Sequence, residues 1–276
     1  LAQVVQERSE KAMREAIAAL PQGVYRNETW NNPLGEKLRY PLALTVSNGS
    51  ITLDFAGAPA QAPRGGLNCT LNYTAAHATY PLKCMLTPNV RGNAGCYRPF
   101  TVEAPEGSIL NASRPMAVNL RTRTGWYIAP NVFGALAGAA PDQVQAATGL
   151  PVAASVYGHD GAGGIYSDLL FMGGGQGASS KRDGKSGLLW PTSAANTSIE
   201  LFETRAPALV IEKTYVTETD RAVTIMLAGG AGYGAPGDRD RAAIARDIED
   251  EKVSPAAARL HYGFDEDEAA REPQEG

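Results

Sequence analysis

The chain has 276 residues, 43% of them hydrophobic and 20% charged, with a formal net charge of −4 at pH 7. This length allows one large or two modest hydrophobic cores, and the acidic balance excludes the basic surface that nucleic acid or an anionic membrane requires. No stretch is apolar enough for a membrane span or a secretory signal. Because the three cysteines, Cys69, Cys84 and Cys96, form no CxxC pair, we expect reduced thiols in a cytoplasmic protein.

The first 55 residues contain two clear local signals. Residues 1–20 place apolar side chains at helical spacing between charged ones, which predicts an amphipathic helix ending at Pro21. The dipeptide Asn48-Gly49 favours a two-residue type I′ turn and therefore a β-hairpin over residues 42–55. The register of that turn puts the large apolar side chains on one face, pairing Val46 with Ile51, Leu44 with Leu53, and Leu42 with Phe55.

The middle of the chain is rich in Pro, Gly and Asn. Residues 57–130 have short apolar runs, such as 108–112 and 116–120, and predict short strands joined by structured loops. Residues 130–140 predict an alanine-rich helix with Pro130 in its first turn. The segment 199–216 alternates like strands.

The end of the chain predicts helices. One is expected over 239–253, followed by a second with Ser254 as N-cap, Pro255 at its first position and Gly263 as its stop. The acidic residues 265–276 are expected to fray. The expected class is α+β, with mixed, largely antiparallel sheets, flanking helices and long Gly/Pro-rich loops. Residues 1–220 would form the body, and 221–276 a C-terminal strand, Gly-rich loop and helical tail.

Two glycine-rich stretches resemble nucleotide-binding motifs. Residues 230–235 fit G-x-G-x-x-A, but Pro236 and Gly237 follow where a phosphate-binding helix would begin. Gly184-Lys185-Ser186 resembles the end of a Walker A loop, yet the glycine needed five positions earlier is Ser179. We therefore expect no nucleotide site at either stretch, and glycines that allow positive φ or close backbone approach.

No metal site is evident from spacing. The three histidines, His77, His159 and His261, are scattered along the chain. Three cysteines and His77 could converge on zinc, but their spacing matches no common zinc pattern, and buried thiols are the simpler interpretation. The absence of G-x-S-x-G leaves a serine hydrolase without support.

Six segments, in this order, resemble the hydantoinase B/oxoprolinase family. They are GSITLDFAGAPAQAPRGGLNCT, GNAGCYRPFTVEAPEGSILNASRPMAV, VFGALAGAAPDQVQAA, MGGGQGASSKRDGKSG, IELFETRAPALVIEKTYV and GGAGYGAPGDRDRAAIARDIEDEKVSPAAARLHYGF. The family includes N-methylhydantoinase B, the B part of 5-oxoprolinase, and the large subunits of acetone and acetophenone carboxylases. The resemblance implies that the glycines at 230–235 are part of the terminal signature of this family.

The resemblance implies a divided reaction. An A-type partner uses ATP to phosphorylate a cyclic amide or an enolised ketone, and the B-type subunit completes hydrolysis or carboxylation, commonly with a divalent metal. The family's N-terminal His/Asp metal motif and an insert after residue 220 have no counterpart here. The resemblance thus implies the C-terminal part of a larger B-type subunit that is inactive alone, binds no cofactor itself, and depends on ATP and a divalent metal elsewhere in the complex. A ketone carboxylase subunit and a non-catalytic scaffold remain alternatives.

The family-like segments suggest a set of site residues. Arg98 and Asp183 are the candidates for catalytic contacts, because an Arg or an Asp can hold an anionic substrate or a metal-bound intermediate. An ordinary ion pair or a loop contact is the alternative for each. The candidates for substrate binding are Asn68, Asn93, Asn111, Gly174, Gly175 and Glu203.

Overall fold

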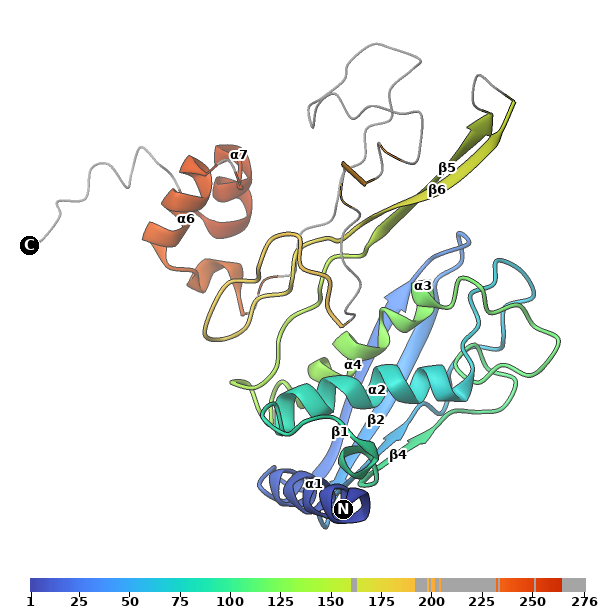
Figure 1. Cartoon of the computed structure of the whole chain (residues 1–276). Coiled ribbons are helices and arrows are strands. Elements are labelled where there is room, and N and C mark those ends of the chain that lie inside the picture. The colour runs from blue at the N-terminus through green and yellow to red at the C-terminus, as the bar shows by residue number, and fades with distance from the viewer. Residues whose placement is uncertain are drawn as a thin grey trace, which may run out of the picture. The chain divides into compact units, whose positions relative to one another are not determined.

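The computed structural model describes residues 1–159, 163–191, 198, 200–201, 204, 232, 234–250 and 252–264. The chain divides into two compact units, residues 1–231 and residues 232–276. The first unit contains a four-stranded sheet and its helices, and the second contains the C-terminal helices (Figure 1). Within the described ranges, no helix has the length and apolar character needed to cross a membrane.

The sheet of the first unit has the strand order β1-β2-β3-β4. Neighbouring strands are antiparallel from β1 to β3, whereas β4 pairs parallel to β3. Helices α2 (Leu71–Leu86) and α4 (Ile128–Leu136) cover one face of the sheet (Figure 1). This mixed sheet with flanking helices confirms the expected α+β class. The strands are β1 (Gly23–Asn31), β2 (Leu38–Ser47), β3 (Ser50–Asp54) and β4 (Phe100–Glu103).

The hairpin between β2 and β3 confirms the register predicted from its turn. Asn48 and Gly49 have φ of 50° and 70°, as a type I′ turn requires. Val46 pairs with Ile51. Leu44 likewise pairs with Leu53, and the paired side chains are buried. The hairpin therefore contributes one apolar face to the core.

Helix α1 (Ala2–Ala18) confirms the expected amphipathic helix. Met13 and Ile17 are fully buried, whereas Val5, nearer the start of the helix, is 47% exposed. Arg14 joins the helix to the hairpin, because its Nη1 donates to Ser50 Oγ at 2.8 Å. The apolar stripe of α1 thus packs on the core of its own chain.

Short strands were expected throughout residues 57–130. This prediction was wrong for the largest element of the region, which is the helix α2. Helix α2 begins after Thr70, whose side chain accepts a hydrogen bond from the Tyr73 amide. Its buried Ala78 and Leu82 have helical spacing, but Pro81 and the many small polar residues obscure that pattern in the sequence. Residues 108–112 and 116–120 form loops with isolated bridges, and β4 is a short strand.

Helix α4 confirms the helix expected near Pro130. It follows the short helix α3 (Thr122–Gly125) and is joined to the sheet by asparagine side chains. Asn27 of β1 donates to Asn131 Oδ1 at 2.9 Å, and Asn131 donates to the Tyr40 carbonyl at 2.8 Å. These bonds satisfy polar groups between the helix and the sheet.

A second sheet in the first unit has two antiparallel strands, β5 (Val152–His159) and β6 (Ile165–Met172). A glycine-rich loop, residues 173–191, follows β6. The strand pattern expected over 199–216 falls almost entirely outside the described residues, and positions 200, 201 and 204 within it are helical.

The second unit confirms the helices expected near the end of the chain. Ser254 Oγ accepts from the Ala257 amide at 3.2 Å, and Gly263 ends the last helix in the left-handed conformation. Ile244, Ala258 and Phe264 form its small core. Its elements are η2 (Pro236–Asp238), α6 (Arg241–Glu249), α7 (Pro255–Ala257) and η3 (Ala258–Tyr262). The acidic residues 265–276 lie outside the described residues.

A buried lysine closes the end of α2. Lys83 is only 8% exposed, and its Nζ donates to the carbonyls of Thr87 at 2.7 Å and Val90 at 2.5 Å. The ammonium group therefore satisfies carbonyls beyond the helix C-terminus, where a positive charge is favourable.

We predict that Lys83→Met lowers the free energy of unfolding by about 2–4 kcal/mol, because two charge-assisted hydrogen bonds are lost while the apolar stem is kept. Chemical denaturation measures this change. Lys11→Met is the matched control, since Lys11 has a 77% exposed side chain, and a change within about 0.5 kcal/mol is expected there. Unchanged or higher stability of Lys83→Met would show that desolvation of the ammonium outweighs its bonds.

Candidate functional site

The sequence-predicted residues lie in three separate places. Arg98 and Asn93 contact α1, Asn68 and Asn111 stabilise the loops around residues 59–69 and 104–118, and Asp183 lies in the glycine-rich loop. Glu203 lies outside the described residues. The candidates therefore do not form a single site.

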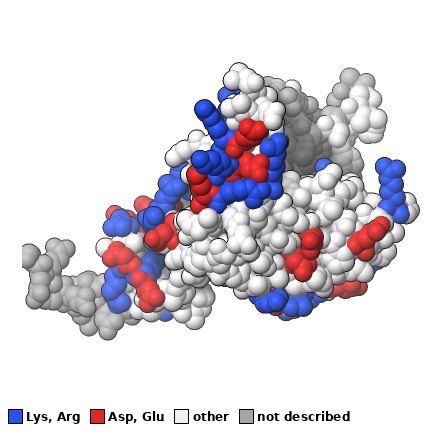
Figure 2. Space-filling model, turned by 90° about the horizontal axis from the view of Figure 1, so that it is seen from below, with Lys and Arg blue, Asp and Glu red and all other residues white. Residues whose placement is uncertain are grey.

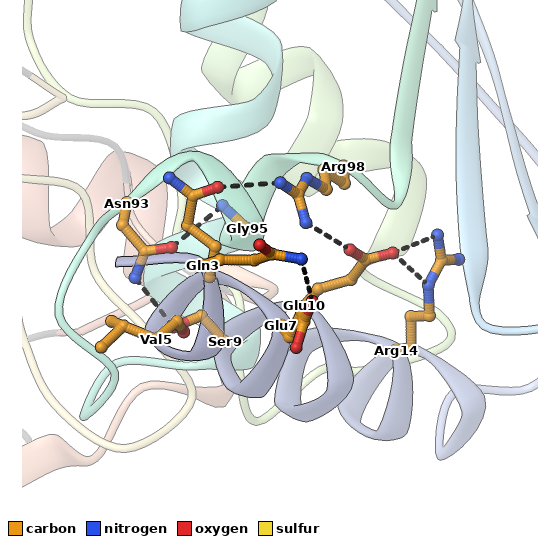
Figure 3. A network of polar contacts seen from close by, with 10 residues as sticks. Gln3, Val5, Glu7, Ser9, Glu10, Arg14, Asn93, Gly95 and Arg98 are labelled. Carbon is orange, nitrogen blue, oxygen red and sulfur yellow. Dashed lines mark hydrogen bonds and ion pairs between the residues drawn. The ribbon is translucent and has the colours of Figure 1, made fainter. Parts of the chain in front are cut away.

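Arg98 and Asn93 hold the N-terminal helix (Figure 3). Arg98 Nη1 lies 3.1 Å from Glu10 Oε2, and Arg98 Nη2 donates to Gln6 Oε1 at 2.8 Å. Asn93 caps the 3-10 helix η1 (Ala94–Tyr97) and donates to Ser9 Oγ at 2.8 Å. Hydrogen bonds from Arg14 and then from Arg98 lower the pKa of the Glu10 carboxyl. Arg98 therefore has the ordinary ion pair that was weighed against a catalytic role, and Asn93, a candidate for substrate binding, has structural contacts.

Asn68 and Asn111 have structural partners as well. Asn68 is fully buried, and its Nδ2 donates to the carbonyls of Ala62 at 2.9 Å and Ala117 at 3.1 Å. Asn111 Nδ2 donates to the Ala104 carbonyl at 3.0 Å. These side-chain bonds connect loops that have no regular ladder of β-sheet hydrogen bonds between them.

The glycine-rich loop folds back on residues 144–149 through backbone hydrogen bonds. The Ala146 amide donates to Ala178 O at 2.8 Å, and the Gly149 amide donates to Gly175 O at 2.9 Å. A Cβ added to Gly177 would lie 1.9 Å from Ala146 O. Close backbone approach therefore explains this glycine, as the sequence suggested. Gly174 is buried in the same loop.

A cavity of about 450 Å³ lies between this loop, α4 and the end of α2. Its apolar side includes Met85, Phe133 and Trp190, and the Phe133 and Trp190 rings stack with centroids 5.2 Å apart. Its polar side chains are Asp142, Gln143, Gln145, Gln176 and Ser179, with Lys181, Arg182 and Asp183 beside them. Of the predicted residues, Asp183 lines this cavity, so we take it as the candidate site.

Two glutamines form the polar wall of the cavity. Gln176 Nε2 donates to Gln145 Oε1 at 2.9 Å. The buried Nε2 of Gln145 has no hydrogen-bond partner among the described residues. Asp142 Oδ1 accepts from Ser180 Oγ at 3.0 Å. Sequence reasoning missed both glutamines and Trp190; the glycine cluster at 173–177 was the signal that pointed to this loop.

Figure 2 shows acidic and basic side chains interspersed on the face seen from below, so this face has no extended area of one charge.

Across the described ranges, no group of three or more His, Cys, Asp or Glu side chains is arranged to hold a metal ion. The divalent metal implied by the resemblance therefore does not fit the described residues, and we derive no metal-dependent step from them.

The residues weighed as zinc ligands have other environments. Burial raises the pKa of the Cys69 thiol to about 12, which keeps it protonated. The His77 ring lies 4.3 Å from the Tyr73 ring, and burial lowers the pKa of His77 from its ordinary value of 6.5. His77 is thus held neutral against an aromatic neighbour.

We predict that His77 makes the protein less stable in mild acid. The unfolded chain binds the proton more tightly than the folded one, so the free energy of unfolding should fall as the pH drops below 6.5 toward the lowered pKa of the folded state. Denaturation from about pH 7.5 to about pH 5 should show a steeper loss in the native protein than in His77→Phe. His159→Phe, which replaces an exposed histidine, is the control for the substitution itself. Parallel profiles for the native protein and His77→Phe would contradict this prediction.

Comparison with known proteins decides the family. The family model described as hydantoinase B/oxoprolinase matches residues 1–222. The chain belongs to the hydantoinase B/oxoprolinase family. The resemblance recognised in the sequence is therefore confirmed.

Two curated relatives carry names from this family. The B-type subunit of a putative D-/L-hydantoinase from Pseudomonas sp. strain NS671 is 31% identical over 154 residues, covering 51% of this chain and 26% of the relative. The 5-oxoprolinase 1 of Arabidopsis thaliana is 26% identical over 222 residues, covering 75% of this chain and 17% of the relative. The matched regions thus span about a quarter or less of these longer proteins.

Two solved structures share the fold. The ATP-dependent caprolactamase from Pseudomonas jessenii has a TM-score of 0.75 at 20% identity, covering 95% of this chain and 60% of that one. A nucleotide-free acetone carboxylase has a TM-score of 0.60 at 15% identity, covering 72% of this chain and 30% of that one. The family-model match and the two similar solved structures therefore each cover most of this chain.

Proposed function

We propose that this chain is part of a B-type subunit in an ATP-dependent complex that hydrolyses a cyclic amide. The observation that carries the proposal is the family match over residues 1–222. Relatives named for hydantoin and 5-oxoproline support a cyclic amide as the substrate, and the fold shared with a caprolactamase agrees with it. We further propose that the partner is an A-type subunit that uses ATP.

Phosphorylation solves the chemical difficulty of opening an unreactive amide ring. The partner transfers the terminal phosphoryl group of ATP to the amide oxygen, which makes the ring carbon more electrophilic and gives it a better leaving group. A first water then adds to that carbon and the ring C–N bond breaks, with the proton going to nitrogen, which leaves an amine and an acyl phosphate. A second water hydrolyses the acyl phosphate, so the products are an amine, a carboxylate and inorganic phosphate. In this proposal the cavity beside the glycine-rich loop holds the ring for the partner's chemistry.

Ketone carboxylation is the second candidate, because the chain shares its fold with an acetone carboxylase at a TM-score of 0.60. Both reactions begin with ATP-dependent activation of a carbonyl oxygen. They differ in the nucleophile and the product: a hydrolase adds water to an amide, whereas a carboxylase joins bicarbonate carbon to an enolised ketone. A purely scaffolding role predicts that the cavity residues are dispensable for both reactions.

We expect the 276-residue chain alone to show no turnover of hydantoin, 5-oxoproline, ε-caprolactam or acetone with ATP, and turnover to appear with the rest of the B-type subunit and the A-type partner. The physical reason is that the proposed reaction begins with phosphoryl transfer from ATP on the partner, and that the described residues contain no group of three or more His, Cys, Asp or Glu side chains arranged to hold a metal ion. Phosphate release and substrate loss measure the reaction. ATP-dependent incorporation of labelled bicarbonate would favour the carboxylase, and metal-stimulated turnover by the pure chain would overturn the division of roles.

A further inference from the structure

Strand β1 forms an open edge of the four-stranded sheet (Figure 1). It pairs with β2 along its whole length in an unbroken register, and no other described strand pairs with it. None of its nine residues is buried, whereas Leu42 and Leu44 of the neighbouring β2 are. One row of its backbone N–H and C=O groups therefore has no β-strand partner among the described residues.

The sequence of β1 lacks the features that commonly protect an edge strand. It contains neither proline nor lysine, and no bulge interrupts its pairing with β2. The strand at the opposite edge of the sheet, β4, is protected by being short, with four residues against nine in β1. A long, regular edge of this kind is a surface on which another strand can pair.

Every second side chain of β1 lies on the sheet face away from α4. Asn27 marks the face toward α4, because its Nδ2 donates to Asn131 Oδ1, and its neighbours alternate to the other face. Arg26 has no ion-pair partner in the described part of the chain, whereas Glu28 Oε2 accepts from Arg39 Nε at 2.6 Å. All four side chains of this outer row are exposed: Val24, Arg26, Glu28 and Trp30.

This outer row is complementary to itself in the antiparallel direction. A two-fold axis at Asn27 puts Arg26 of each copy opposite Glu28 of the other. It also puts Val24 opposite Trp30, and both kinds of cross-strand pair stabilise a sheet. A shift of the register by two residues would instead put Arg26 opposite Arg26, or Glu28 opposite Glu28, and like charges disfavour both arrangements.

We propose that β1 is an interface between two copies of this chain, whose sheets join through antiparallel β1–β1 pairing into one continuous sheet. The partner is a second copy because each side chain of the outer row finds its complement within the same row. Helix α4 contacts both β1 and β2, and two strands span about 10 Å, which is also about the diameter of a helix. The two copies of α4 can therefore lie side by side. This inference concerns assembly and does not depend on the proposed reaction.

Sedimentation velocity of the 276-residue chain, from about 1 to about 100 µM, measures the assembly. We expect a monomer–dimer equilibrium with the dimer predominating at about 50 µM, because an edge-to-edge contact of this size gives a weak complex. Hydrogen exchange at the two ends of the concentration range locates the interface. Protection of the amides of residues 23–31 should rise with concentration, while that of β4 should not change.

Reversal of the two charges tests the register. Arg26→Glu should weaken self-association at least about tenfold, because it puts two carboxylates opposite each other in both facing pairs. Glu28→Arg should have a similar effect through two guanidinium groups. An equal mixture of the two variants should associate within about threefold of the native affinity, because every facing pair is again of opposite charge. Arg8→Glu is the matched control, since it makes the same change at an exposed residue of α1, and it should keep the native affinity.

The hydrogen-exchange measurement needs no variant, so the proposal remains testable if a reversal variant folds poorly. A native chain that stays monomeric at about 100 µM would overturn the proposal, as would native affinity in Arg26→Glu. Well-folded reversal variants that do not associate when mixed would contradict the register. If the native chain is monomeric and Arg26→Glu weakens its binding to the rest of the B-type subunit, the edge belongs to that subunit and the two-fold pairing is wrong.

Discussion

Gly95→Ala is expected to lower the free energy of unfolding by about 3–5 kcal/mol and to loosen helix α1. A Cβ at this position would lie 2.0 Å from Gln6 O, 2.7 Å from Gln6 C and 2.8 Å from Gln6 Cα. All three atoms belong to the α1 backbone, so no side-chain rotation relieves the overlap. The helix must move away from the turn that contains Gly95.

That movement would break the contacts that hold α1 (Figure 3). The Asn93 bond to Ser9 and the Arg98 bonds to Gln6 and Glu10 all cross the same interface. The buried stripe of Met13 and Ile17 would also lose packing. We therefore expect the stability loss to combine strain, broken polar contacts and exposed apolar surface.

Thermal and chemical denaturation measure the effect, and the midpoint temperature should fall by about 10 °C. Hydrogen exchange over residues 2–18 should rise in parallel. Gly92→Ala is the matched control, because Gly92 lies just before η1 and a Cβ there meets nothing within 4 Å. Equal stability of the two variants would refute the close approach of the turn to α1.

Gly184→Ala is expected to reduce turnover by the reconstituted complex about a hundredfold, with a smaller effect on the folding of the body. A Cβ on Gly184 would lie 1.7 Å from Gln176 O and 2.6 Å from Gln176 C. The backbone N–H of Gln176 also donates to Lys185 O at 2.8 Å. The two segments of the loop that contain Gln176 and Gly184 therefore cannot separate without losing that bond. Gln176 must shift, and its bond to Gln145 shifts with it.

The expected pattern is loss of activity and of lactam binding with far-UV circular dichroism unchanged. Gly138→Ala, just after α4, is the control, because a Cβ there meets nothing within 4 Å. It should keep native activity. Full activity of Gly184→Ala would remove the cavity from the proposed function.

The candidate site was predictable only in part. Asp183 and Gly174 were proposed because they lie in the family-like segment MGGGQGASSKRDGKSG, and both lie in the loop beside the cavity. Arg and Asn are common residue types in functional sites. The roles of Arg98 and Asn68, however, depend on which backbone groups their side chains contact in the folded chain. Nothing near Gln145 in the sequence indicates an unpaired donor, because its environment comes from a loop about thirty residues away.

Short-range signals determined the helix of residues 2–18, the Asn48-Gly49 hairpin with its register, and the caps at Ser254 and Gly263. In each case the deciding contacts join residues a few positions apart, so the local sequence contains the whole cause. The sequence of α2 contains conflicting signals, because its buried residues have helical spacing whereas Pro81 disfavours a helix interior. Burial of α2 against α4 and the sheet stabilises the helix in spite of the proline. The parallel pairing of β3 with β4, the Gly95 contact with α1 and the cavity depend on residues tens of positions apart. Only the tertiary structure decides those contacts, since chain closure over such distances is set by the packing of the whole core.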